Sequence, residues 1–404
     1  MDEYQARETV VRAGIELIKS GLIVRTWGNI SCRIDDTRFA ITPSGRAYET
    51  LKPEDIVICT IADGKIADAS RTGKIKPSSE KGVHALIYRI SGEAGIVIHT
   101  HQRFASAVAS SGVSIIQDEK MGIIPVAAYS LPGTKKMMRS IEAVLTQAKG
   151  AILMSNHGAL CYGKDYSETF STAYALEESC KSFMFDSYMK TSGAESFNKQ
   201  QILDYYFKKV TRDKYSTDQR SGTVPSTQTS VFTIKKSRRD GSGIIASTAL
   251  LDGTTDGETS YSKSTSPMPD EARMHLAIYS SRPEINNIEF SDNEYVVAAS
   301  LAGKPLYPLL DDFAQMMGKP MCIAAPDEIV KVLGKAGGIL IPGAGALCCA
   351  ATESDAHALC LVTEKNALAE ICAAIVGKPK PLSFFDCFLM HLVYTKKYAK
   401  KQRV

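Results

Sequence analysis

The chain has 404 residues, of which 48 are lysine or arginine and 44 are acidic, and 44% are hydrophobic. This length predicts two domains, and a formal charge of only +4 gives no reason to expect nucleic-acid binding. No apolar run approaches the roughly 20 residues of a membrane span, and the acidic N-terminus is not typical of a signal peptide. The ten cysteines lie mostly in apolar runs without a CxxC pair, so we expect free thiols and a cytoplasmic protein.

Helical and strand-like patterns alternate through the first half of the chain. Apolar residues at helical spacing predict a helix over the first 20 residues, and another is predicted from about Ser78, where serines precede a glutamate. Strands are predicted at 39–42, 55–61, 95–101 and 151–156, and further helices at 103–111, 134–147 and 166–189. Short strand-like runs between helices favour a layered α/β sandwich.

The composition changes near residue 195. Residues 193–230 are rich in Ser, Thr, Gln and Lys and poor in aliphatic residues, except for a helical patch at 202–210. We therefore predict a first domain over 1–195, a linker over 196–224 and a second domain over 225–404. A helix predicted over 383–399 has an apolar face and is expected to dock on the second domain.

The second half of the chain repeats three segments of the first in the same order, about 190 residues later. These pairs are KPSSEKGVHALIYR (76–89) with SPMPDEARMHLAIYS (266–280), FAITPSGR (39–46) with FTIKKSRR (232–239), and AILMSNHGALC (151–161) with GILIPGAGALC (338–348). The repeat predicts two copies of one domain in tandem.

Three of the seven histidines fall at the ends of two predicted strands. Alternation along a strand points His99 and His101 to the same side, so both rings can reach one ion. His157 ends another buried strand and is followed by a glycine. Three neutral imidazoles with an open position suit Zn²⁺, and other divalent ions remain possible. His84, one helical turn after Glu80, recurs in the second copy as His275 and is expected to have a packing or hydrogen-bonding role.

Three short segments could cradle an anion. They combine glycines, which let an anion approach the backbone, with serine hydroxyls, and one of them precedes a helix. The segments are GNIS at 28–31, TPSG at 42–45 and PSS at 77–79.

Together with HTH and NHGAL, the TWGNIS, TPSG and KPSSE motifs resemble the class II aldolase/adducin family, strongly over residues 1–190 and weakly over about 225–376. The resemblance implies a three-layer αβα sandwich of that type, present twice in tandem. It also implies that His99, His101 and His157, with Glu80, hold Zn²⁺ or another divalent metal ion. The residues that would hold a substrate phosphate are Gly28, Asn29, Ser44, Gly45, Ser78 and Ser79.

The family includes sugar-phosphate aldolases, sugar-acid phosphate decarboxylases and ribulose-phosphate 4-epimerases. A glutamate stands at the position of Glu80 in the aldolases and an aspartate in the epimerases, so the resemblance favours a metal-dependent aldolase. Such an enzyme would cleave or form a carbon–carbon bond in a ketose 1-phosphate through a metal-stabilised enediolate, with Glu80 transferring the proton. The alternatives are a decarboxylase, a 4-epimerase and an adducin-like scaffold. Family active sites lie between subunits, which implies a homo-oligomer.

The second proton donor is the main departure from the family pattern. The aldolases take a catalytic tyrosine from a neighbouring subunit, but its position falls on Lys120 here, after Asp118 and Glu119, and Tyr129 is out of register. In the second copy, the three histidines become Phe290, Asp292 and Ala344. One active site is therefore expected, with the second domain as a structural partner, an assembly surface or one wall of the site.

Overall fold

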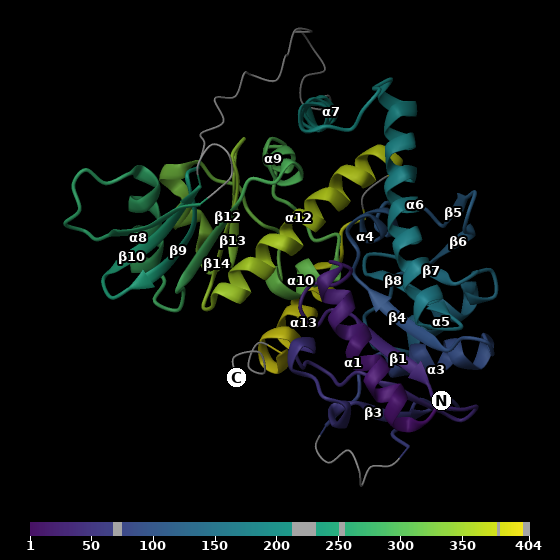
Figure 1. The fold of residues 1–404 in the computed structure, drawn as a ribbon. Helices are drawn as coiled ribbons and strands as arrows, with labels where there is room; N and C mark the ends of the chain where they lie inside the picture. The colour runs from purple at the N-terminus through teal and green to yellow at the C-terminus, as the bar shows by residue number, and fades with distance from the viewer. Residues whose placement is uncertain (68–74, 212–231, 250–254, 378–379, 399–404) are drawn as a thin grey trace.

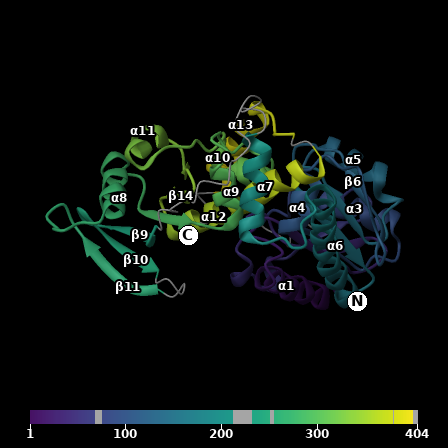
Figure 2. The same cartoon turned by 90° about the horizontal axis from the view of Figure 1, so that it is seen from above.

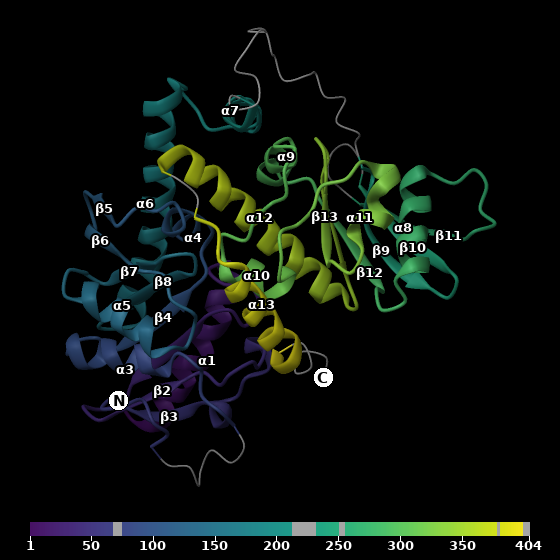
Figure 3. The same cartoon turned by 180° about the vertical axis from the view of Figure 1, so that it is seen from behind.

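The computed structural model describes residues 1–404 apart from 68–74, 212–231, 250–254, 378–379 and 399–404. Two β-sheets lie toward opposite ends of the molecule (Figure 1, Figure 2). The long helix α12 (Glu353–Val376) runs between them, as the view from behind also shows (Figure 3). We refer to the part built on the first sheet as the first unit and to the part built on the second sheet as the second unit.

The first unit has eight strands in the order β3-β2-β1-β4-β8-β7-β6-β5, and only the β6–β7 pair is parallel. Its strands are β1 (Asn29–Arg33), β2 (Arg38–Ile41), β3 (Val57–Thr60), β4 (Ile96–Thr100), β5 (Ile115–Asp118), β6 (Gly122–Ala127), β7 (Ala151–Met154) and β8 (Gly158–Gly163). Its helices are α1 (Glu3–Lys19), α3 (Lys81–Ile90), α4 (Arg103–Ala109), α5 (Lys135–Leu145) and α6 (Tyr166–Ser192), with 3-10 turns at Tyr48–Thr50 and Pro53–Asp55.

Strand alternation explains how helices cover both faces of this sheet. In β4, Ile96 and Ile98 join the core beneath α1, α4 and α6, whereas Val97 joins the core beneath α3 and α5. The period of two keeps His99, at the end of β4, on the same side as Val97. His99 therefore lies on the side of the sheet where α3 begins.

The second unit has six strands in the order β11-β10-β9-β12-β14-β13, all antiparallel to their neighbours. They are β9 (Ile234–Asp240), β10 (Gly243–Ala249), β11 (Thr255–Tyr261), β12 (Asn287–Ser291), β13 (Gly338–Ile341) and β14 (Gly345–Ala350). The other helices after α6 are α7 (Lys199–Thr211), α8 (Asp270–Ser281), α9 (Glu294–Ser300), α10 (Asp311–Met317), α11 (Ile329–Leu333) and α13 (Phe384–Val393), with a 3-10 turn at Pro326–Glu328 and a π-helical turn at Tyr394–Tyr398. Helices α8 and α11 cover one side of this sheet, and α9 and α12 cover the other.

The structure corrects one segment of the predicted repeat. Strand β9 holds the place of β1, between the counterparts of β2 and β4, so FTIKKSRR corresponds to the region of GNISCR and not to FAITPSGR. Ser31 Oγ is hydrogen bonded to His84 Nδ1 at 2.7 Å, and Ser237 Oγ to His275 Nδ1 at 2.8 Å. The GNIS segment therefore has a counterpart at 234–237. The local sequence similarity of FTIKKSRR favours the segment of β2, and only the strand pairing shows that its counterpart is β1.

The two units share a packed interface. Helix α12 packs on its own sheet and also on α4 and α6 of the first unit. Helix α13 packs on α10, as the apolar pattern at 383–399 predicted, and its residues Cys387 and Met390 also contact Tyr129 and Leu131 of the first unit. An ion pair between Arg25 and Asp355, at 2.8 Å, crosses the same interface.

Most of the predicted elements are confirmed to within a few residues. Strands β1, β5, β6 and β8 lie outside the predicted strands: β1 and β5 contain polar residues, β6 contains a proline, and β8 begins and ends with glycine. The helical patch at 202–210 is part of α7, which packs on α9. All ten cysteines are free. Within the part of the chain that the structure describes, no helix is long and apolar enough to cross a membrane.

Candidate metal centre

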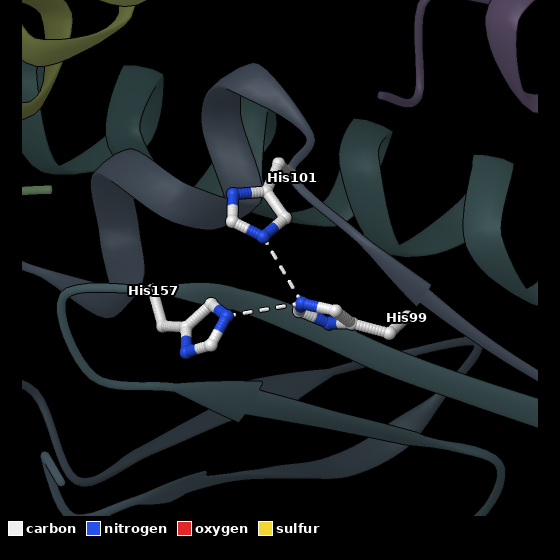
Figure 4. Close-up of side chains that lie close together, drawn as sticks. All are labelled: His99, His101 and His157. Atoms are coloured by element: carbon white, nitrogen blue, oxygen red, sulfur yellow. Dashed lines mark hydrogen bonds between the residues drawn. The ribbon is translucent and has the colours of Figure 1, made fainter. Parts of the chain in front are cut away.

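The three predicted histidines converge at one point (Figure 4). His99 Nε2 lies 3.0 Å from His101 Nε2 and 3.0 Å from His157 Nε2. All three side chains are buried, and their nitrogens form a group that could hold a metal ion. His99 comes from the end of β4, His101 follows that strand, and His157 comes from the turn between β7 and β8. The structure therefore brings these three rings together, as their spacing in the sequence predicted.

The outer nitrogens of these rings show that a cation fits among them. His99 Nδ1 donates a hydrogen bond to the Ala159 carbonyl oxygen at 2.9 Å, and His101 Nδ1 donates to Asp312 Oδ2 at 3.3 Å. His157 Nδ1 faces Asp311 Oδ2 at 3.4 Å. Since a neutral imidazole carries one proton, a proton on each Nδ1 leaves a lone pair on each Nε2. Three lone pairs that face one another suit a bound cation.

Glu80 stands beside this cluster at the N-terminal end of α3. Its two carboxylate oxygens lie 3.5 Å from His99 Nε2 and 3.6 Å from His157 Nε2. Asn29 Nδ2 donates a hydrogen bond to Glu80 Oε2 at 2.8 Å, and the other end of the Asn29 amide is hydrogen bonded to His84 Nε2. The predicted hydrogen-bonding role of His84 is confirmed, because it orients the amide that holds Glu80.

Burial and neighbouring groups shift the pKa values of His101, His157 and Glu80. It lowers the pKa of His101 to about 4 and that of His157 well below its usual value, so both rings are neutral at pH 7. Burial alone would raise the pKa of Glu80. Attraction to His99 and the hydrogen bond from Asn29 outweigh burial and lower this pKa to about 2. A carboxylate beside three imidazole nitrogens is a suitable ligand set for a divalent ion.

The second unit contributes buried charges that the sequence did not predict. Asp311 and Asp312 begin α10, and Lys365 lies in the middle of α12. Lys365 Nζ forms an ion pair with Asp312 and donates a hydrogen bond to the His101 carbonyl oxygen at 3.2 Å. Burial and the Asp312 carboxylate raise the pKa of Asp311 well above its usual value. Burial would also raise the pKa of Asp312, but Lys365 and His101 outweigh it and lower that pKa.

The candidate metal centre opens into a cavity of about 370 Å³. All six residues predicted to hold a phosphate line it, together with Glu80 and the three histidines. The six are Gly28, Asn29, Ser44, Gly45, Ser78 and Ser79. The serine of the TPSG turn and the serines before α3 are brought together because the backbone N–H of Ser78 donates to the Thr42 carbonyl oxygen at 3.0 Å.

The opposite wall of the cavity is mostly apolar and comes largely from the second unit. Its residues follow or belong to α10 and α13, and a loop of the first unit adds Leu131 and Pro132. Tyr394 stacks on Trp27, with ring centroids 6.0 Å apart, and accepts a hydrogen bond from Arg25 at 2.9 Å. The wall residues from the second unit are Asp311, Gln315, Leu389, Met390, Val393 and Tyr394.

The residues considered for the second proton donor do not line this cavity. Asp118, Glu119 and Lys120 lie in the β5–β6 hairpin, where the Asp118 carboxylate accepts a hydrogen bond from the backbone of Lys120 at 2.8 Å. Tyr129 is packed against the apolar residues of α13. In the second unit, the segment between α9 and β13 carries α10 instead of a hairpin, and this segment reaches the histidines.

The second copy has lost the metal-binding side chains, as the sequence predicted. The strand register places Phe290 and Asp292 at the positions of His99 and His101, and Ala344 at that of His157. Phe290 stacks on Phe232, and Asp292 pairs with Lys235 at 2.7 Å. Glu271 accepts hydrogen bonds from backbone N–H groups near the start of β9, so it has a structural partner in place of a metal.

Comparison with known proteins agrees with this architecture. The family model described as "Class II Aldolase and Adducin N-terminal domain" matches residues 8–184 and again residues 220–371. The chain therefore belongs to the class II aldolase/adducin family, and it contains the domain twice in tandem.

The similar proteins with named activities each cover less than half of the chain. L-ribulose-5-phosphate 4-epimerase UlaF of Salmonella typhi is 32% identical over 190 residues, covering 43% of this chain and 81% of the relative. A 5-deoxy-D-ribulose 1-phosphate aldolase of Bacillus thuringiensis is 33% identical over 178 residues, covering 42% and 80%. Among solved structures, an L-fuculose 1-phosphate aldolase is 25% identical with a TM-score of 0.42, covering 48% of this chain and 90% of its own. Another, from Thermus thermophilus, is 26% identical with a TM-score of 0.40, covering 47% and 98%.

Proposed function

We propose that this protein is a metal-dependent aldolase that cleaves or forms a carbon–carbon bond in a sugar phosphate such as a ketose 1-phosphate. The observation that carries the proposal is the position of the Glu80 carboxylate, about 3.5 Å from the converging nitrogens of the histidine cluster. His99, His101 and His157 would hold Zn²⁺ or another divalent ion, with Glu80 as a further ligand at rest. The bound ion would act as a Lewis acid toward a substrate carbonyl.

Glu80 is the residue proposed to move the proton. The Asn29 amide anchors its Oε2 by a hydrogen bond, so Oε1 can accept a proton from a substrate carbon while the carboxylate stays in place. The chain of hydrogen bonds from Ser31 through His84 to Asn29 fixes the orientation of this carboxylate.

The direct test is a panel of ketose phosphates, with release of dihydroxyacetone phosphate as the readout and metal analysis of the purified protein alongside. We expect roughly one divalent ion per chain, and loss of activity on chelation that zinc restores. Protein without bound metal and without turnover on the whole panel would favour the adducin-like scaffold instead.

A 4-epimerase is the second candidate, because a ribulose-phosphate 4-epimerase is 32% identical over 190 residues. The two candidates differ in their products. An epimerase would interconvert L-ribulose 5-phosphate and its 4-epimer without releasing a free aldehyde, whereas an aldolase would release one. The glutamate at position 80, which resembles the aldolases, favours bond cleavage.

Ser79 provides a test of the phosphate cradle. Its side chain is exposed within the cavity, whereas the Ser78 hydroxyl already accepts a hydrogen bond from the Glu80 N–H at 3.2 Å. Ser79→Ala should raise KM for a phosphorylated substrate about tenfold and leave kcat nearly unchanged, because one hydrogen bond to a charged group remote from the reacting carbon is lost. Inorganic phosphate should also inhibit the variant more weakly. An unchanged KM would place the phosphate elsewhere.

Gly158 tests the strand packing that holds the histidines. A Cβ at this position would lie 2.2 Å from the carbonyl oxygen of Thr100, which stands between His99 and His101 in sequence. Gly345 is its counterpart, where a Cβ would lie 2.1 Å from the Ser291 carbonyl oxygen. Gly158→Ala should lose roughly 2 kcal/mol in the free energy of unfolding, measured with urea, and Gly345→Ala should lose more because its φ of 143° also disfavours alanine. Only Gly158→Ala should bind zinc more weakly, and equal zinc affinity of the two variants would contradict the proposed ligand geometry.

A further inference from the structure

The metal-binding histidines of the first unit are in contact with carboxylates of the second unit. Asp312 Oδ2 accepts the hydrogen bond of His101 Nδ1 at 3.3 Å, and Asp311 Oδ2 lies 3.4 Å from His157 Nδ1. Asp311 and Asp312 are completely buried. Within the described chain, neither side-chain oxygen of Asp311 has a hydrogen-bond partner. Two buried carboxylates directed at the ligand rings are unusual for a unit that has lost its own metal site.

Further contacts hold both carboxylates, Asp312 and Asp311, in place beside the histidines. Lys365 pairs with Asp312 and binds the His101 carbonyl oxygen, so one ammonium group holds both partners of that hydrogen bond. Next to His157, the backbone N–H of Asp311 donates to the Asn156 carbonyl oxygen at 3.0 Å, and Asn156 Nδ2 donates to the Leu309 carbonyl oxygen at 2.8 Å. Asn156 has a φ of 60°, and its counterpart in the second copy, Gly343, has a φ of 70°. The asparagine thus keeps a turn that favours glycine and adds a link to the second unit.

The charges around the histidine cluster also favour a bound cation. Glu80, Asp311 and Asp312 supply three buried carboxylates, and Lys365 is the buried ammonium group beside them. Lys365 pairs with one of these carboxylates, Asp312, and a divalent cation among the histidines would favour the ionised form of the other two.

We propose that Asp312, Asp311 and Lys365 are positioning residues through which the second unit orients the metal ligands of the first. A carboxylate on the outer nitrogen fixes the tautomer and direction of a metal-binding imidazole and makes it a stronger ligand. The second unit is then required for metal affinity, although it holds no metal of its own. The inference rests on the metal centre of the proposed function and is independent of the substrate.

The test uses the full-length protein and measures zinc affinity by competition with a chromophoric chelator. Asp312→Asn should weaken zinc binding by about tenfold or more. It also leaves Lys365 buried without its carboxylate, which can destabilise the fold. The double variant Asp312→Asn, Lys365→Met removes both charges. It should regain much of the thermal stability and still bind zinc at least about tenfold more weakly than the wild type.

Asp355→Asn is the matched control, because Asp355 pairs with Arg25 across the same interface without contacting the histidines. It should bind zinc within about twofold of the wild type, since the ligand rings keep their partners. A double variant that is folded and binds zinc as tightly as the wild type would overturn the inference but leave the metal centre intact. A wild-type protein that binds no zinc or other divalent ion would overturn the metal centre itself, and the inference with it.

Discussion

Replacing Glu80 by glutamine should lower kcat by about a thousandfold, while the protein keeps its metal ion. The amide has nearly the same shape as the carboxylate and can still contact Asn29, but it cannot accept a proton from carbon. The three histidines remain in place to hold the metal. Turnover of a ketose phosphate and metal content per chain, measured on the same preparation, give the two readouts.

The tandem repeat offers a matched control for this variant. Glu271 occupies the position of Glu80 in the second copy, and its carboxylate accepts backbone hydrogen bonds near β9. Glu271→Gln should therefore leave kcat within about twofold and affect mainly stability. An active Glu80→Gln enzyme would contradict the proton-transfer role, and loss of its metal would show that Glu80 is needed chiefly as a ligand.

A chain that ends after Ser192 should lose turnover and most of its solubility. Helices α4 and α6 would expose the surface on which α12 packs, and exposed apolar surface of this kind promotes aggregation. The truncated chain would also lack the carboxylates that contact His101 and His157. Soluble yield and activity, compared with the full chain, measure the effect.

Adding residues 196–404 back as a second chain tests whether the losses of solubility and turnover come from the missing interface. Co-expression of residues 196–404 as a second chain should restore part of the soluble yield and of the activity, because the interface can form between separate chains. A truncated protein that stays soluble and fully active would show that the second domain, including the cavity wall that it contributes, is not needed for turnover.

The candidate site was predictable where it depends on local spacing. Alternation in a strand places His99 and His101 on one side, and the glycine after His157 allows β8 to approach β4 closely. The serines of the cradle also lie where turns and a helix begin. These features follow from short stretches of sequence, so a pattern can reveal them.

The repeat shows the limit of such patterns. Two of its three segments align as the letters predicted, but FTIKKSRR corresponds to β1 instead of β2. Short strands contain few distinctive residues, whereas the hydrogen bonds of Ser31 and Ser237 to equivalent histidines leave no ambiguity. Strand pairing is a long-range property, and the sequence of one strand does not specify its neighbour.

By itself, the sequence predicted the αβα class of fold and its tandem occurrence. It also predicted that the three histidines and Glu80 form one candidate metal centre, and that the second copy has no equivalent ligands. Only the tertiary structure decided that Asp311, Asp312 and Lys365 reach those histidines and that α13 closes one wall of the cavity. Asp312 lies 211 positions after His101 in the chain. Their contact depends on how α10 and α12 pack against the first unit, and no local spacing of residues records that packing.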